Sequence, residues 1–176
     1  MTTTPRDEPP TNALILELER VHDMLRRDLR SCQDLAAAAR AGAPATDLRG
    51  AVEQLGRRSP HLRLGVDCVR FCALVHAHHG GEDRTLFPVV RRDAPHLAPV
   101  IDRLEADHRV VSDLLDRIEA AVDRLADAGT ADASRDVVDA LDALSDHLLA
   151  HLALEEEVLR PFLLSMDSWP TTERAG

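Results

Sequence analysis

Apolar residues recur at alternating steps of three and four along four long stretches of the chain, which is the spacing of an amphipathic helix with one buried face. Helix start and stop signals bound these stretches. The first stretch follows Thr11 and Asn12, two N-cap candidates, and ends before Gly42 and Pro44. We therefore predict long helices at 12–40, 61–91, 99–128 and 134–166, with a short extra helix at 47–58 between the first two.

Four long helices with short joins are typical of an all-α, up-down-up-down four-helix bundle. The bundle is expected to form one domain at 12–166, with disordered tails at 1–11 and 167–176. The composition agrees with this fold, because only 2% of the 176 residues are aromatic while Ala, Leu and Arg are abundant. An all-β fold is thereby excluded.

The charge and the cysteines restrict the partners and the compartment. A formal net charge of −10 opposes binding to phosphate backbones, so neither DNA nor RNA is expected as a partner. The three cysteines are too few and odd in number for a disulfide framework, and Cys68 and Cys72 are expected to pack in the core. Residues 1–10 are polar, without an apolar stretch suited to a signal peptide or a membrane anchor. We expect a cytoplasmic protein without membrane association and, since no large aromatic patch indicates an interface, a monomer.

Each predicted helix has one polar break in its otherwise apolar face. In the first and third helices the break is a single histidine, and in the second and fourth it is a histidine followed four residues later by a glutamate. After this break the apolar positions of the second helix continue with a slight phase slip, at Leu86 and Val89. The interrupting residues are His22, His78, Glu82, His108, His151 and Glu155.

An internal repeat singles out the same residues. The first and third helices share Glu-x-x-His, and the second and fourth share His-x-x-x-Glu with a proline six residues after the glutamate. The chain is therefore interpreted as two duplicated helical hairpins. The repeat selects His78 and Glu82 over the adjacent pair His79 and Asp83, which has the same spacing but lies off the apolar face. His79 is a candidate for supporting the site from outside the set of ligands.

The six residues are expected near one level of the bundle, because they lie at similar distances from the helix ends and a helix rises about 1.5 Å per residue. A buried layer of imidazoles and carboxylates would be costly without a cation, since each unpaired buried ion carries a large desolvation penalty. We therefore predict a dinuclear metal site. Nitrogen and carboxylate ligands without thiolate suit iron or manganese best, and zinc also accepts them.

The remaining histidines are assigned other roles. His147, one turn before His151, is a candidate additional ligand, although Leu148 occupies the core-facing position beside it. The other three histidines are expected to face solvent or to cap helices; they are His61, His76 and His96.

The segments HDML at His22, HHGGEDRTLFP from His78, EADHRVV around His108 and HLALEEEVLRP from His151 together resemble the hemerythrin-like family. The resemblance covers the chain from about Asn12 to Met166. It implies a bundle that holds two irons bridged by carboxylates and an oxo or hydroxo group, with Glu82 and Glu155 in the bridging positions. The oxygen-carrying members use five histidines and HxxxxD in the last helix. This chain has HxxxE there and is more similar to the symmetric branch of iron–sulfur-cluster repair proteins and iron or oxygen sensors.

The expected function is that of a non-heme diiron protein that binds or senses O₂, NO or peroxide at an open coordination position. The main alternative is a diiron oxidoreductase with oxidase, peroxidase or catalase-like activity. Its electron donor is unidentified, because Gly80 and Gly81 are adjacent within a helix and form no dinucleotide-binding loop. A ferritin-like arrangement would use Glu19 and Glu105 as ligands and leave His78 and His151 without a role. A helical scaffold without metal is the remaining alternative.

Overall fold

The computed structural model describes residues 11–40, 60–128 and 131–170, and all the regular elements in these ranges are helical. The extra helix predicted at 47–58 lies outside the described residues. The elements are α1 (Ala13–Arg40), α3 (Pro60–Gly81), the π-helical turn η1 (Glu82–Leu86), α4 (Phe87–Asp93), the 3₁₀ turn η2 (Pro95–Leu97), α5 (Ala98–Ala128) and α6 (Ala131–Leu164).

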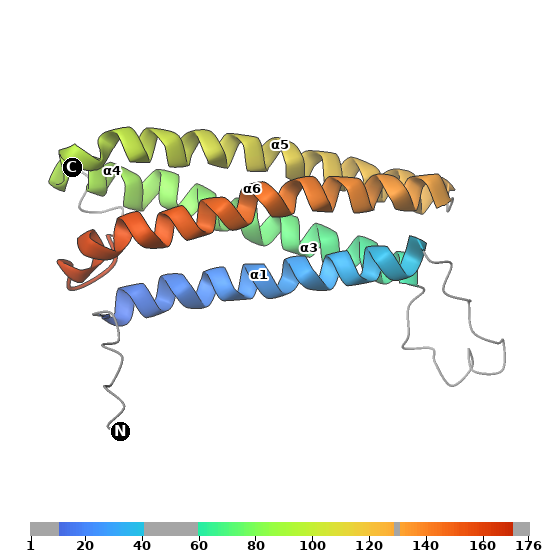
Figure 1. Ribbon diagram of the computed structural model, residues 1–176, viewed down its shortest axis with the longest axis horizontal. Helices are drawn as coiled ribbons and strands as arrows, with labels where there is room; N and C mark the ends of the chain where they lie inside the picture. Colours follow the sequence, from blue (N-terminus) through green and yellow to red (C-terminus); the bar gives the residue numbers. More distant parts are fainter. Residues whose placement is uncertain (1–10, 41–59, 129–130, 171–176) are drawn as a thin grey trace, which may run out of the picture.

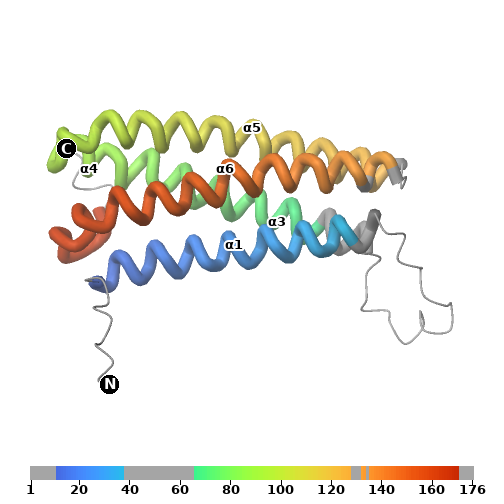
Figure 2. Tube along the Cα trace, in the orientation of Figure 1, coloured from blue at the N-terminus to red at the C-terminus, as the bar shows by residue number. Residues whose placement is uncertain are grey.

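The four long helices form an antiparallel bundle (Figure 1). Around the bundle, α1 packs against α3 and α6, and α5 packs against the same two helices from the other side. Successive long helices run in opposite directions, as the colours of the tube show (Figure 2). The predicted all-α four-helix bundle is confirmed. The first and third predicted helices agree with α1 and α5 to within a residue, while α6 begins three residues earlier than predicted, at Ala131.

A polar layer divides the interior of the bundle into two apolar cores. One core runs from Leu25, Val75 and Val111 toward the far ends of the helices, and the other is built around Leu18, Phe87 and Leu104. Along the chain the predicted polar breaks fall where the first core meets the second, and in α6 Leu152 of the first core lies within the break. The polar residues are thus enclosed by apolar packing above and below.

The second predicted helix is not a continuous α-helix to Arg91, as the sequence predicted. It changes at Glu82 into a π-helical turn and resumes as α4 at Phe87. The ring of Pro88 would meet the carbonyl of Arg84 in a regular α-helix, and a wider turn before the proline relieves this contact. Thr85 Oγ1 donates to the carbonyl of Gly81 over 2.6 Å within the same turn. The extra residue of a π-turn accounts for the phase slip in the apolar pattern.

The segment after α6 returns along the end of the bundle. Ser165 and Met166 hydrogen-bond back to the last turn of α6, and Trp169 packs against the second apolar core. The indole N–H of Trp169 donates to Glu17 of α1 over 2.7 Å. Trp169, which the sequence placed in the C-terminal tail, therefore contacts the bundle in the structure.

Candidate metal centre

All six predicted ligands meet in the polar layer, and His79 joins them. Five of the predicted residues are buried, with Glu155 and His22 fully enclosed, and the side chain of His78 is 12% exposed. The layer comprises His22, His78, His79, Glu82, His108, His151 and Glu155.

The polar layer contains two groups of candidate metal ligands. The first comprises one histidine from α1, one from α3 and the two glutamates. His22, His78, Glu82 and Glu155 each offer one nitrogen or oxygen atom within 4.8 Å of those of the others. The Nε2 atoms of His22 and His78 lie 3.0 Å apart. A cation with four ligand atoms could be held between them.

The second group joins His108 of α5 and His151 of α6 to His79 of α3, again with ligand atoms within 4.8 Å of one another. The Nε2 atoms of His108 and His151 lie 3.1 Å apart. The ring of His79 stacks on that of His108 with centroids 4.0 Å apart and an interplanar angle of 8°. Phe87 stacks near the same histidine, at 5.3 Å, and limits its movement.

Both glutamates contact histidines of both groups. Glu82 lies 3.3 Å from His78 Nε2 and 3.6 Å from His108 Nε2. Glu155 lies 3.5 Å from His22 Nε2 and 3.7 Å from His151 Nε2. Each carboxylate therefore lies between the two groups of imidazoles.

Carboxylates outside the layer orient its histidines. His22 Nδ1 lies 2.8 Å from Glu156 Oε1, which Arg26 also contacts at 2.9 Å. His108 Nδ1 lies 2.8 Å from Asp83 Oδ1. A carboxylate at Nδ1 fixes the orientation of the ring and turns Nε2 toward the interior. Each of these carboxylates directly follows a glutamate of the layer in sequence, a signal that the repeat contained and the sequence analysis missed.

Burial sets the protonation of the layer. It lowers the pKa of both His78 and His151 to about 4 and also lowers the pKa of His79, so these imidazoles are neutral near pH 7. Burial alone would lower the pKa of His22, but the Glu155 carboxylate, 3.5 Å from Nε2, and the hydrogen bond to Glu156 raise it. Burial and the neighbouring Glu155 carboxylate raise the pKa of Glu82.

Several buried polar atoms of the layer lack a hydrogen-bond partner, and this indicates that the layer fits a cation. Both oxygens of Glu82, both oxygens of Glu155 and His79 Nε2 are buried without a hydrogen-bond partner in the part of the chain that the structure describes. Buried polar atoms are nearly always satisfied in folded proteins. Neutral imidazoles and carboxylate oxygens that converge in this way are suited to divalent metal ions.

The geometry corrects the predicted positions of two histidines and leaves their role as ligands a prediction. His79 was expected outside the ligand set, yet it is only 5% exposed and belongs to the second group. The candidate additional ligand His147 is exposed and is not part of either group. Its side chain leaves the helix one residue before the core-facing Leu148, about 100° around the helix axis.

The glutamates of the ferritin-like alternative also lie outside the layer. Glu19 pairs with Arg160, and Glu105 lies 2.9 Å from Arg91 Nη2. Both glutamates are partly exposed. The structure instead places His78 and His151, which that arrangement leaves without a role, at the centre of the layer.

The structure has a buried layer of imidazoles and carboxylates drawn from all four helices. Such a layer is typical of helical-bundle domains that bind metal cations. The chain belongs to the hemerythrin family: the model of the hemerythrin HHE cation binding domain matches residues 13–163. No curated protein and no solved structure gives a match. None of the helices that the structure describes combines the length and the apolar composition that a membrane crossing requires.

Proposed function

We propose that the layer holds two iron ions bridged by Glu82 and Glu155, and that the protein binds or senses a small diatomic molecule or peroxide there. The observation that carries the proposal is the position of the two glutamates, each within 3.7 Å of histidine nitrogens from both groups. A single ion could not use both groups together with two carboxylates. Two ions with shared carboxylates use every ligand atom of the layer.

We assign the two ion positions from the two groups of candidate ligands. His22 and His78 would hold one ion, His108, His151 and His79 would hold the other, and the glutamates would join them. Nitrogen and carboxylate donors favour iron or manganese over softer metals. The three cysteines are buried in the apolar part of the bundle and are not members of either group.

When bound, a pair of irons supplies reversible redox chemistry and open positions for small ligands. The protein's own contribution is to orient the Nε2 atoms of His22 and His108 inward through Glu156 and Asp83 and to exclude bulk water with the two apolar cores. This enclosure favours a ligand of few atoms. The enzyme alternative, an oxidase, peroxidase or catalase-like activity, uses the same site and is separated from ligand binding by turnover.

The proposal is tested by quantifying metal in protein purified without oxygen and by recording spectra of the reduced protein under O₂, NO and peroxide. We expect two irons per chain in the wild type and loss of iron in His78→Ala. His76→Ala is the matched control, since His76 lies two residues earlier on α3 and its side chain is 39% exposed. Stable and reversible spectra would support a binding or sensing function, and repeated turnover would support the enzyme. Absence of stoichiometric metal from the wild type would refute the proposal.

A further inference from the structure

A cavity of about 260 Å³ reaches the polar layer from outside the bundle. It lies between α1, the end of α3 with the π-helical turn, and Trp169. His78 and Glu82 line it, and they are the members of the layer that keep some exposure on this side, at 12% and 7% of their side chains. The cavity therefore borders two residues of the first group, with the carboxylate oxygens of Glu82 buried behind its wall.

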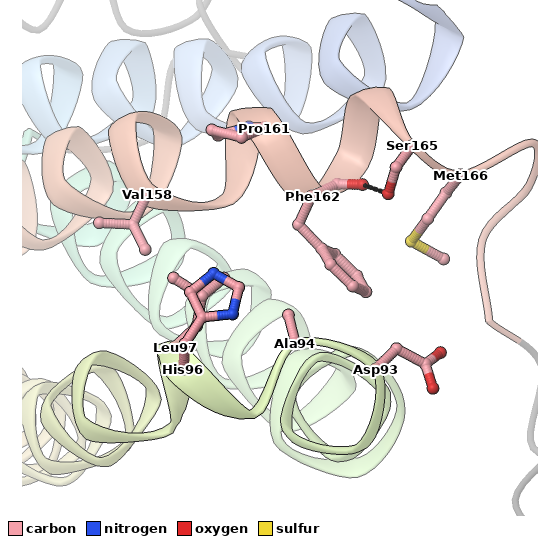
Figure 3. Close-up of a pocket in the computed structure, with 9 residues that line it drawn as sticks. All are labelled: Asp93, Ala94, His96, Leu97, Val158, Pro161, Phe162, Ser165 and Met166. Atoms are coloured by element: carbon pink, nitrogen blue, oxygen red, sulfur yellow. Dashed lines mark hydrogen bonds between the residues drawn. The ribbon is translucent and has the colours of Figure 1, made fainter.

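A larger cavity of about 540 Å³ lies between α4, η2 and the end of α6 (Figure 3). Its lining includes Asp93, His96, Phe162 and Met166 but no residue of the polar layer. Figure 3 shows these side chains at the end of the bundle. This larger cavity offers no route to the ligand atoms.

We propose that the smaller cavity is the binding cavity and access route for an uncharged molecule of a few atoms, such as NO or hydrogen peroxide, on its way to the His22 and His78 side of the layer. The inference rests on the proposed function, because it assumes metal ions in the layer. It adds the route, the residues that set its width and the charge of the ligand that can pass.

The lining of the cavity selects against anions. Its walls are largely apolar, and its ionisable groups include the carboxyl groups of Glu17 and Glu82. No Lys or Arg is found among the described residues that line it. The indole N–H of Trp169 is occupied by Glu17. An anion would lose its hydration in this cavity without gaining a cationic partner. An uncharged ligand does not carry this desolvation cost.

Gly81 sets the width of the route on the α3 side. A Cβ atom added at Gly81 would meet no atom within 4 Å, so the space beside it is open. Its backbone is right-handed helical, with φ −68° and ψ −48°, which any L-residue adopts. A leucine at this position would therefore fill the cavity without straining the backbone.

Gly80 provides a matched control on the same turn. A Cβ atom at Gly80 would meet the end of the flexible Arg84 side chain, at 2.8 Å from Nη1, and Gly80 does not line the cavity. Gly80→Leu thus adds the same side chain and a similar gain in helix propensity without narrowing the route. Trp169→Ala is the opposite perturbation, since it removes one wall of the cavity.

The experiment measures, by stopped flow, how fast NO changes the spectrum of the reduced, iron-loaded protein. We expect Gly81→Leu to slow this reaction by about tenfold or more, Gly80→Leu to leave it within about twofold, and Trp169→Ala to accelerate it. Iron content should stay unchanged in all three variants. Hydrogen peroxide should follow the same order. With azide as an anionic probe, the rate should rise with ionic strength, because salt screens the carboxylate of Glu17 on the route.

The outcomes separate this inference from the proposed function. Unchanged NO rates in Gly81→Leu and Trp169→Ala, with iron bound, would overturn the route and leave the metal site standing. Loss of iron from Gly81→Leu would also overturn it, because the residue would then act on ligand geometry. If Gly81→Leu does not fold, a rate for Trp169→Ala equal to that of the wild type refutes the route. A wild type without iron refutes the proposed function itself.

Discussion

Replacement of Glu82 by glutamine is expected to stabilise the metal-free protein, which is the opposite of the usual effect of a change in a core. Both carboxylate oxygens of Glu82 are buried without a hydrogen-bond partner among the described residues, and the side chain is 7% exposed. Burial and the charge of Glu155 raise the pKa of Glu82 above its ordinary value. Glutamine keeps the shape of the side chain and removes the ionisable group.

The magnitude follows from the cost of a buried polar group that lacks a partner, about 1–3 kcal/mol. Because the amide also stays partly unpaired, we expect the free energy of unfolding to rise by about 1–2 kcal/mol at pH 7. For a chain of this length that corresponds to a rise in Tm of about 2–8 °C. Under the proposed function the sign should reverse with iron bound, since the variant would lose one bridging carboxylate.

The pH dependence of the difference has a definite sign. Below pH 4.5, the ordinary pKa of the group, a carboxyl group whose pKa is raised on folding is protonated in both the folded and the unfolded state. In that range the buried group therefore destabilises the folded protein least. As the pH rises above 4.5, the unfolded chain releases the proton first and gains stability relative to the folded wild type. The advantage of Glu82→Gln should therefore grow between pH 4.5 and pH 7.

The assay is urea denaturation followed by far-UV circular dichroism, with a chelator and again with iron. Glu157→Gln on α6 is the control, because Glu157 is exposed and its replacement should change stability by less than about 0.5 kcal/mol. A metal-free Glu82→Gln protein that is less stable than the wild type by more than about 1 kcal/mol would refute the reasoning. It would mean that Glu82 is well solvated or paired in the absence of metal.

Two further predictions concern the layer and the cysteines. His79→Leu should weaken iron binding by about 10- to 100-fold in a competition titration with a chelator, whereas His147→Ala should leave it unchanged, and equal affinities in both variants would show that His79 is no ligand. None of the three buried cysteines should react with a thiol reagent at pH 8 in the native protein, because burial raises the pKa of Cys72 to about 12, and a hydrogen bond with Cys32 together with burial raises that of Cys68. All three should react in denaturant, and rapid labelling of the folded protein would contradict the buried cluster.

The sequence was sufficient for the bundle and for the level of the site because both depend on periodicity. A helix in a bundle presents a residue to the core at every third or fourth position, so a polar residue at such a position must be buried. His22 and His108 were found in this way, and their places between the two apolar cores confirm the prediction that they are buried. Their role as metal ligands stays a prediction.

Helical periodicity could not predict the burial of His79 or the contact of Asp83, because it assigns to the core only one narrow row of positions along each helix. A layer that is filled by seven side chains from four helices is wider than that row, and adjacent positions, about 100° apart, both reach it. His79 is buried in the layer, and Asp83 reaches His108 from its edge. The π-helical turn shifts the following residues by one position. In the sequence, the phase slip of the apolar pattern at Leu86 was the only sign of this turn.

The duplication that organises the chain breaks at His79. His78 corresponds to His151 in the repeat, so the counterpart of His79 is Leu152, which is fully buried in the first apolar core. One half of the repeat therefore supplies an imidazole where the other supplies packing, and the two groups of ligand atoms become unequal. Under the proposed function the ion between His22 and His78 has fewer imidazoles than its neighbour. It also borders the smaller cavity, through His78, so the position with more room for an external ligand is the one that such a ligand can reach.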